Sequence, residues 1–221
     1  MMKPPQAICF DLDGVLIDTM PLHADAWQEA VRRFGLRVRR REIYSWEGEP
    51  GTATAKRLLR RQGRRSMREA AELLRLKEAL FKRSARRIRV HPRLAAWIAQ
   101  RSRRGLAIGL VTGTSAHEVR RIVPAALRRQ FRVIVTGTDV RRGKPDPEPY
   151  RTAFARLRVA PRRAAVVENA PYGITSARRA GAGCIVALVS SLPPRYLRGA
   201  DRIVRSVAEL IRTLDRLVRV N

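Results

Sequence analysis

The segment Ile8–Ile17 constrains the fold of this chain more than any other stretch. Its apolar run Ile8-Cys9-Phe10 is typical of a buried parallel strand, and Asp11-Leu12-Asp13-Gly14 follows directly. Two carboxylates this close together are costly unless a cation or a reaction uses them. Ligands of open α/β sheets bind at this end of the strands. Taken alone, the motif also fits a strand-end Asx turn at the surface, so its meaning depends on the rest of the chain.

Apolar runs of β type recur, and from Leu106 onward they alternate with helical stretches. The runs are Ala7–Phe10, Leu106–Val111, Val133–Thr136, Ala164–Val167 and Cys184–Val189. Strands separated by helices favour a parallel sheet, and nearly continuous apolar strands favour burial on both faces. We therefore expect an α/β fold, a Rossmann-like parallel sheet with helices on both faces. Cys9 and Cys184 lie within these runs and are expected to be buried thiols rather than a disulfide.

The segment from about 18 to 90 contains no convincing strand. Helical spacing covers Pro21–Phe34, Thr52–Arg61 and Ser66–Ile88, and Ser66 with Glu69 forms a capping-box pattern. A structureless loop of this length is improbable in a compact domain. The sequence therefore predicts a helical cap domain, residues 18–90, inserted after the first strand. The core would consist of residues 1–17 and 91–221, with the cap over the two aspartates.

The charge of the chain is unusual. The net charge is +28, and only five of the 47 basic residues are lysines, so 42 are arginines. Such a field attracts anions, including nucleic acid and phosphorylated metabolites. The arginines are spread along the whole chain, however, without a basic tail, zinc-finger spacing or an RNA-binding signature. We expect a solvated basic surface and no specific nucleic-acid partner. Without an apolar run of 18 residues or a recognisable signal peptide, we also expect a cytoplasmic monomer with no membrane attachment.

Three later segments place polar side chains at the ends of strands or in a stiff loop. Thr112-Gly113-Thr114-Ser115 ends the second strand at a helix start, where N–H groups and hydroxyls can hold a phosphate, although such residues are also ordinary N-caps. Lys144, in a proline-rich loop, can direct its charge at a phosphoryl group or simply be solvated. Glu168-Asn169 offers oxygen ligands of the kind Mg²⁺ prefers, or a helix-capping turn.

Together the four segments resemble the signature motifs of the haloacid dehalogenase superfamily, in order and at suitable spacing: DLDGVLIDT, LVTGTS, GKPDPEPY and VVENAPYGITSARRAG. The resemblance covers nearly the whole chain. Within the superfamily the chain is most similar to β-phosphoglucomutase-like and phosphoglycolate-phosphatase-like proteins, which have a helical cap after the first strand. The resemblance implies a magnesium-dependent phosphatase acting on a small phosphorylated metabolite, such as a sugar phosphate or a compound like phosphoglycolate.

The resemblance also implies catalytic roles. Asp11 would be the nucleophile that becomes an aspartyl phosphate. Asp13 would protonate the leaving alcohol and then activate water. Four residues would bind or neutralise the phosphoryl group: Thr112, Gly113, Thr114 and Lys144. His23 would lie near the mouth of the site and couple cap closure to proton transfer by Asp13, unless it is only a polar residue of the first helical turn.

The same resemblance implies a magnesium site with one departure. Mg²⁺ would be held by Asp11, the backbone carbonyl of Asp13 and Asn169, with Glu168 as a direct or indirect ligand, and would reduce the repulsion between nucleophile and substrate. Asn169 stands where an aspartate is commoner. An amide oxygen can still bind Mg²⁺, but one negative charge is lost. We therefore expect weaker metal binding unless Glu168 compensates.

A second departure bears on the reaction. Mutases of this branch grip a distal phosphate with a cap arginine and with a basic residue after the second motif. The corresponding stretches here, Trp46–Thr54 and Ser115-Ala116, contain no basic residue. Both losses favour hydrolysis over a sugar-phosphate mutase, unless other cap arginines substitute. A nucleic-acid-binding protein with a degenerate fold is the remaining alternative, and the intact motif residues argue against it.

Overall fold

The sheet of the protein is entirely parallel. The computed structural model describes residues 4–84, 88 and 90–219. Six strands pair in the order β3-β2-β1-β4-β5-β6. Their bounds are β1 Ala7–Phe10, β2 Ala107–Val111, β3 Val133–Val135, β4 Ala164–Glu168, β5 Cys184–Leu188 and β6 Arg202–Val204. The predicted α/β fold and its five strands are confirmed, and β6 was not predicted, because this short edge strand begins at an arginine and has no apolar run.

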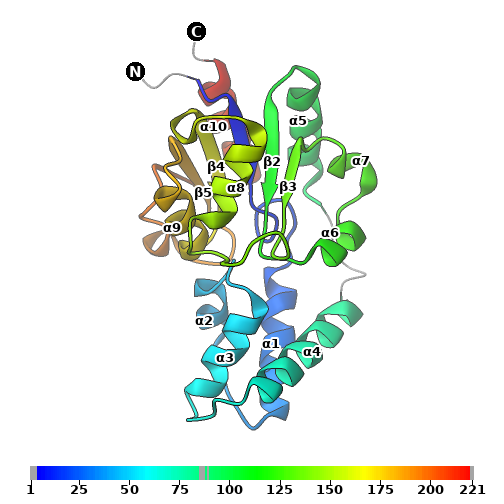
Figure 1. Ribbon diagram of the computed structural model, residues 1–221. Helices are drawn as coiled ribbons and strands as arrows, with labels where there is room; N and C mark the ends of the chain where they lie inside the picture. Colours follow the sequence, from blue (N-terminus) through cyan, green and yellow to red (C-terminus); the bar gives the residue numbers. More distant parts are fainter. Residues whose placement is uncertain (1–3, 85–87, 89, 220–221) are drawn as a thin grey trace.

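Helices cover both faces of the sheet (Figure 1). Successive side chains of a strand point to opposite faces, so Ile8 and Phe10 join one apolar cluster while Ala7 and Cys9 join the other. The first cluster includes residues of α5 (Pro92–Arg103) and α10 (Val207–Arg219), and the second includes residues of α8 (Glu148–Leu157) and α9 (Pro171–Arg179). Shorter elements complete this part: α6 Ala116–Ile122, α7 Ala125–Arg128, and the 3₁₀ turns Pro161–Arg163 and Pro194–Tyr196.

Four helices form a separate layer beyond the carboxyl ends of the strands (Figure 1). They are α1 Met20–Arg33, α2 Arg40–Ser45, α3 Gly51–Arg60 and α4 Met67–Ser84. Their apolar residues pack into a cluster of their own, around Trp27, Leu58 and Leu73. The three predicted helices are present, whereas the short α2 was not predicted. The predicted α4 ran too far, since Ile88 is not helical; residues 85–87 lie outside the described part of the chain.

The two ends of this helical segment lie side by side beyond the carboxyl end of β1. Ile17 and Val90 form an antiparallel bridge, and the His91 amide donates to the Leu16 carbonyl at 2.9 Å. The chain therefore leaves and re-enters the sheet layer at one place, close to the predicted boundaries. The division into core and cap stays a prediction that this geometry supports.

Two further expectations concern the cysteines and the membrane. Cys9 and Cys184 are both buried free thiols, as predicted. Burial raises the pKa of the Cys9 thiol to about 12 despite the nearby Lys144 ammonium. Within the described ranges, the helices are too short or too polar to cross a membrane.

Candidate active site

The strand order brings the four sequence motifs to one edge of the sheet. Asp11 and Asp13 follow β1, and β1 lies between β2 and β4. Thr112 follows β2, while Glu168 ends β4. The strand order reverses between β1 and β4, and ligands of open parallel sheets bind at such a switch point. The predicted residues at the strand ends therefore gather around the end of β1, and Lys144 and His23 join them through contacts with Asp11 and Asp13.

Lys144 connects two of these motifs from below the cavity. Its Nζ donates to Asp11 Oδ1 and to Glu168 Oε1, both at 2.6 Å, and to the Val111 carbonyl at 3.0 Å. The Lys144 side chain is 1% exposed. Burial lowers the pKa of this ammonium, but the Asp11 and Glu168 carboxylates outweigh burial and raise it above its ordinary value. Lys144 is therefore a fixed positive charge between the two carboxylates.

Asp11 is short of positive charge even with Lys144 in contact. Burial raises the pKa of its carboxyl, the Lys144 ammonium lowers it, and the neighbouring Glu168 and Asp13 carboxylates raise it again, to about 8. Asp11 is 4% exposed. A buried carboxylate in this setting is stabilised by an additional cation. The position of Asp11 thus suits a residue that works together with a bound metal ion.

Asp13 accepts hydrogen bonds on both carboxylate oxygens. Thr19 Oγ1 donates to Oδ1, and Thr114 Oγ1 donates to Oδ2 at 2.8 Å, with Thr112 Oγ1 at 3.5 Å from Oδ2. His23 Nε2 lies 3.3 Å from Oδ1. Burial raises the pKa of Asp13, but the contacts with His23, Thr19 and Thr114 outweigh it and bring the pKa below its ordinary value. Asp13 is therefore an ionised, firmly oriented carboxylate in this arrangement.

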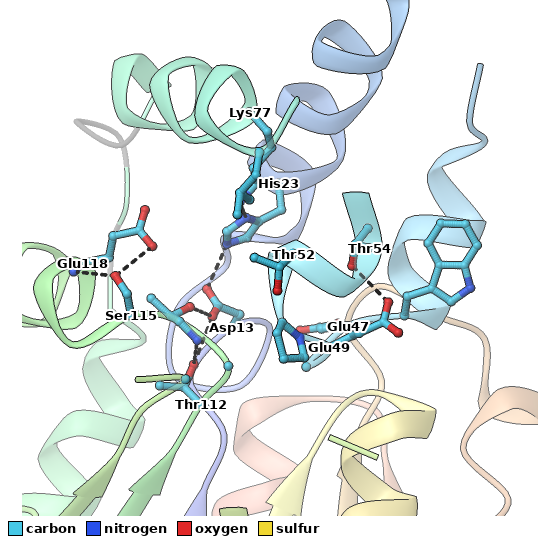
Figure 2. A pocket seen from close by; sticks show the side chains of 18 of the residues that line it. Asp13, His23, Glu47, Glu49, Thr52, Thr54, Lys77, Thr112, Ser115 and Glu118 are labelled. Atoms are coloured by element: carbon cyan, nitrogen blue, oxygen red, sulfur yellow. Dashed lines mark hydrogen bonds and ion pairs between the residues drawn. The ribbon is translucent and has the colours of Figure 1, made fainter. Parts of the chain in front are cut away.

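His23 and Lys77 connect the helical layer to Asp13. Lys77 Nζ lies 3.0 Å from His23 Nδ1, and the His23 ring stacks on Phe81 at 4.0 Å. Figure 2 shows the His23 side chain between Lys77 and Asp13. Burial and the Lys77 charge lower the pKa of His23, against the opposing effect of Asp13. Lys77 was not predicted; the available signal was a lysine at the centre of the buried stripe Leu73, Lys77, Phe81.

Glu168 is fully engaged within the protein. Besides Lys144, its Oε1 accepts from the Tyr150 hydroxyl at 2.6 Å, and Oε2 accepts from the backbone N–H of Asn169 at 3.1 Å. Gly173 packs directly on this carboxylate, since a Cβ at Gly173 would lie 1.9 Å from Oε1. These contacts favour an indirect role for Glu168 behind any metal ion. Tyr150 ends the GKPDPEPY motif, but its contact with Glu168 was not predicted, because a tyrosine at the start of a helix is usually an ordinary core residue.

Asn169 faces a carboxylate that the sequence did not indicate. Asn169 Nδ2 donates to both oxygens of Glu47, at 3.0 and 2.9 Å, and to Ser190 Oγ at 3.2 Å. Asn169 Oδ1 is buried and has no hydrogen-bond partner. Burial and the nearby Asp11 carboxylate raise the pKa of Glu47 well above its ordinary value. Glu47 lies in the turn between α2 and α3, within the stretch Trp46–Thr54 that contains no basic residue.

A cavity of about 270 Å³ opens between the sheet edge and the helical layer. Asp11, Asp13, Thr112, Gly113, Thr114 and His23 are among the residues that line it. Figure 2 shows Glu47 and Glu49 on the side opposite Glu118. Eight of the described lining residues are charged or histidine: Asp11, Asp13, His23, Glu47, Glu49, Lys77, Glu78 and Glu118. None of the lining residues within the described chain is an arginine.

The donor set fits a hard divalent cation only if it includes an amide and a backbone oxygen. Within the described residues, no three His, Cys, Asp or Glu side chains form a cluster that could hold a metal ion alone. However, Asn169 Oδ1 is a buried oxygen without a hydrogen-bond partner. The Asp11 carboxylate is a second oxygen ligand, whose raised pKa shows that the nearby Lys144 does not fully offset burial and the neighbouring carboxylates. Hard cations such as Mg²⁺ choose these ligands and keep several waters. The residues present fit such an ion.

Comparison with known proteins agrees with this arrangement. Residues 8–187 match the family model of haloacid dehalogenase-like hydrolases. The protein CbbY of Cereibacter sphaeroides is 33% identical, with 93% of this chain and 94% of that protein covered. Hexitol phosphatase A of Escherichia coli is 30% identical, with 91% of each covered. The crystal structure of CbbY from Rhodobacter sphaeroides with xylulose-1,5-bisphosphate superposes with a TM-score of 0.78 and 30% identity, covering 93% and 96% of the two chains. The chain therefore belongs to the haloacid dehalogenase-like hydrolase family.

Proposed function

We propose that this protein is a magnesium-dependent phosphomonoester hydrolase that works through an aspartyl-phosphate intermediate. The observation that carries the proposal is the contact of Asp11 with the buried ammonium of Lys144, beside the separately oriented carboxylate of Asp13. Family membership and the similarity to a hexitol phosphatase support the same reaction. The proposed substrate is a small phosphorylated metabolite that enters the cavity above these residues.

Asp11 is the proposed nucleophile. One oxygen is held by Lys144 at 2.6 Å, and this contact orients the carboxylate for attack on phosphorus. The phosphoryl oxygens would be received by the Thr112 hydroxyl and the Gly113 amide, with the Lys144 charge beneath them. The Thr114 amide donates to Thr112 Oγ1 at 3.0 Å and so supports the position of that hydroxyl. The bond from phosphorus to the leaving oxygen breaks as the bond to Asp11 forms, and water later releases phosphate from Asp11.

Asp13 is the proposed acid and base. In the arrangement described, its lowered pKa keeps it ionised, which suits the activation of water in the second step. To protonate the leaving alcohol in the first step, it must first gain a proton. His23 contacts the same oxygen and is itself contacted by Lys77. A change in the position of the helical layer would therefore change the proton affinity of Asp13.

The proposed magnesium ligands are Asp11, the backbone carbonyl of Asp13 and Asn169, with Glu168 behind them. When bound, Mg²⁺ would supply charge that lowers the repulsion between Asp11 and an anionic substrate. Residues 18–90 are the proposed cap domain. Its closure over the edge of the sheet would exclude water during phosphoryl transfer and select the substrate.

The charge of the cavity supports a substrate with a single anionic group. Carboxylates outnumber cationic groups among its lining residues, and the described lining contains no arginine that could bind a second phosphate. Arg57 is the arginine closest in sequence to the stretch Trp46–Thr54. Its side chain is paired with Glu49 at 2.7 Å and donates to the Tyr172 hydroxyl at 3.2 Å. These contacts favour hydrolysis of a neutral polyol or sugar monophosphate over a mutase reaction, which needs a bisphosphate.

Substitution of the nucleophile tests the proposal. Asp11→Asn should lower the turnover of p-nitrophenyl phosphate and of sugar phosphates by at least about 10³-fold, because an amide cannot form the covalent intermediate. EDTA should abolish the wild-type activity and added Mg²⁺ should restore it. Retention of full activity by Asp11→Asn would exclude the mechanism. Release of inorganic phosphate, measured against isomerisation of a hexose phosphate, separates the phosphatase from the mutase.

A further inference from the structure

The unusual residue of the fourth motif, Asn169, is matched by a charged residue from the helical layer. Its side-chain amide donates to both oxygens of Glu47 at 3.0 and 2.9 Å. Glu47 is 8% exposed, and Ser191 Oγ lies 3.5 Å from one of its oxygens. The two residues are 122 positions apart in sequence, so only the packing of the helical layer on the sheet brings them together.

Glu47 fixes the orientation of the Asn169 amide. The Nδ2 end of the Asn169 side chain faces the two Glu47 oxygens. With a cation bound beside it, Glu47 would be ionised and could only accept these hydrogen bonds. The Oδ1 end is then turned away, and it is buried without a partner. An aspartate at this position could not make the same pair, because two carboxylates would face each other. The amide is therefore the residue type that both accepts Glu47 and leaves one oxygen available.

The loop that carries Glu47 fits the core closely. Gly48 has φ +85°, and a Cβ there would lie 2.7 Å from the Lys144 side chain. A Cβ at Gly113 would lie 3.0 Å from the Gly48 carbonyl oxygen. Positive φ and the close approach both require glycine at position 48. The residue next to Glu47 thus packs on the methylene groups of Lys144 and on Gly113, and this contact fixes the position of the loop.

We propose that Glu47 supplies from the cap the negative charge that Asn169 lacks, so that the cation site is completed only when the cap loop packs on the core. This proposal rests on the proposed function, because it assigns Glu47 to the same metal site. Glu47 acts as a positioning residue: it orients the amide oxygen of Asn169 and adds a carboxylate close to Asp11. The charge lost in the fourth motif is thereby supplied by the helical layer, and metal affinity becomes linked to the packing of that layer on the sheet.

A charge-exchange experiment tests this proposal by metal binding rather than activity. Mg²⁺ affinity is measured by titration calorimetry, with Mn²⁺ as a second probe, for the wild type, Glu47→Gln, Asn169→Asp and the double variant. Glu47→Gln should weaken Mg²⁺ binding by about tenfold, the lower range for residues that support metal ligands. The double variant, which returns the carboxylate to the fourth motif, should bind Mg²⁺ more tightly than Glu47→Gln and close to the wild type.

The controls separate charge from structure. Glu42→Gln removes a cap carboxylate that pairs with Arg61 outside the cavity, and its Mg²⁺ affinity should equal that of the wild type. Glu47→Asp keeps the charge and should bind Mg²⁺ better than Glu47→Gln. Thermal unfolding of each variant verifies the fold. If Glu47→Gln does not fold, Glu47→Asp is compared with the wild type instead.

Two results would overturn the assignment of Glu47. One is a Glu47→Gln protein that binds Mg²⁺ as tightly as the wild type. The other is a double variant that binds no better than Glu47→Gln, which would reduce Glu47 to a structural hydrogen-bond acceptor. Hydrolysis of p-nitrophenyl phosphate by the wild type is followed in parallel. Its absence would contradict the phosphatase proposal while the titrations still decide the role of Glu47.

Discussion

At the scale of single residues, uncharged positions constrain the site as strongly as the charged ones. Glu168 holds Lys144 and Tyr150 because Gly173, at the start of α9, leaves room for its carboxylate. The Lys144 ammonium in turn contacts Asp11. A small change at Gly173 would therefore reach the proposed nucleophile through two side chains.

Gly173→Ala should accordingly lower both stability and activity. Helix propensity alone would stabilise this variant by about 0.5–1 kcal/mol. The new Cβ, however, would lie 1.9 Å from Glu168 Oε1 and must displace the carboxylate. We expect a net loss of about 1–3 kcal/mol in the free energy of unfolding, the usual cost of overpacking. Urea unfolding and kcat/KM measure both effects, with Thr175→Ala in the same helix as control. Unchanged stability together with unchanged kcat/KM would contradict this packing.

At the scale of elements, α4 serves two purposes. Its buried stripe of Leu73, Lys77 and Phe81 packs against the other helices of the helical layer and places the Lys77 ammonium beside His23. Its first turn is closed by Ser66, whose Oγ accepts from the Glu69 amide at 3.2 Å. The stability of this end of the helix and the chemistry at its middle are therefore separable.

Ser66→Ala should destabilise the protein without altering catalysis. Loss of an N-cap side chain costs about 1 kcal/mol, because one amide of the first turn loses its acceptor. Ser66 is exposed and does not line the cavity, so kcat/KM should stay at the wild-type value. Chemical denaturation gives the stability change, and Ser66→Asp, which retains an acceptor, should recover most of it. A Ser66→Ala protein as stable as the wild type would show that the Ser66 N-cap contributes nothing to the free energy of unfolding.

At the scale of the whole molecule, the charge of the surface and that of the cavity have opposite signs. The chain carries a net charge of +28, yet acidic residues dominate the cavity. Glu78 and Glu118 line it from α4 and α6, and burial together with the Glu118 charge raises the pKa of Glu78. Such a protein attracts anions over its surface but receives beyond the phosphate site only groups that tolerate negative neighbours.

A matched series of 6-phosphates tests this selectivity. We expect kcat/KM to fall in the order glucosamine 6-phosphate, glucose 6-phosphate, 6-phosphogluconate. Besides its phosphate, the first compound carries a cationic amino group, the second carries no other charge, and the third carries an anionic carboxylate. A repulsion of ~1.4 kcal/mol for the carboxylate would give a tenfold difference between the last two. Glu118→Gln should narrow that difference, whereas Glu72→Gln, on the outer face of α4, should not. Equal or faster hydrolysis of 6-phosphogluconate would contradict the selection by charge.

Local sequence patterns predicted much of the fold and the proposed site residues. Asp11, Asp13, Thr112, Lys144 and Asn169 could be named because each follows a strand or lies in a stiff loop. Residues at the ends of parallel strands must meet at one edge of the sheet. The runs of β type and the helical spacing before Leu106 were equally readable, since burial imposes a period on the sequence.

Only the tertiary structure decided which residues from elsewhere join that edge. Glu47 and Lys77 lie far from the motifs in sequence, where they resemble an ordinary loop residue and an ordinary surface residue. Tyr150 ends the GKPDPEPY motif, but nothing in the sequence pairs it with Glu168. Their roles depend on contacts across layers, such as Glu47 with Asn169 and Lys77 with His23. Hydrogen bonds between distant segments leave no periodic signal in the chain, because they are set by how whole elements pack. The sequence thus determined the parallel sheet and its edge, and the packing of the helical layer determined the charge and shape of the cavity above it.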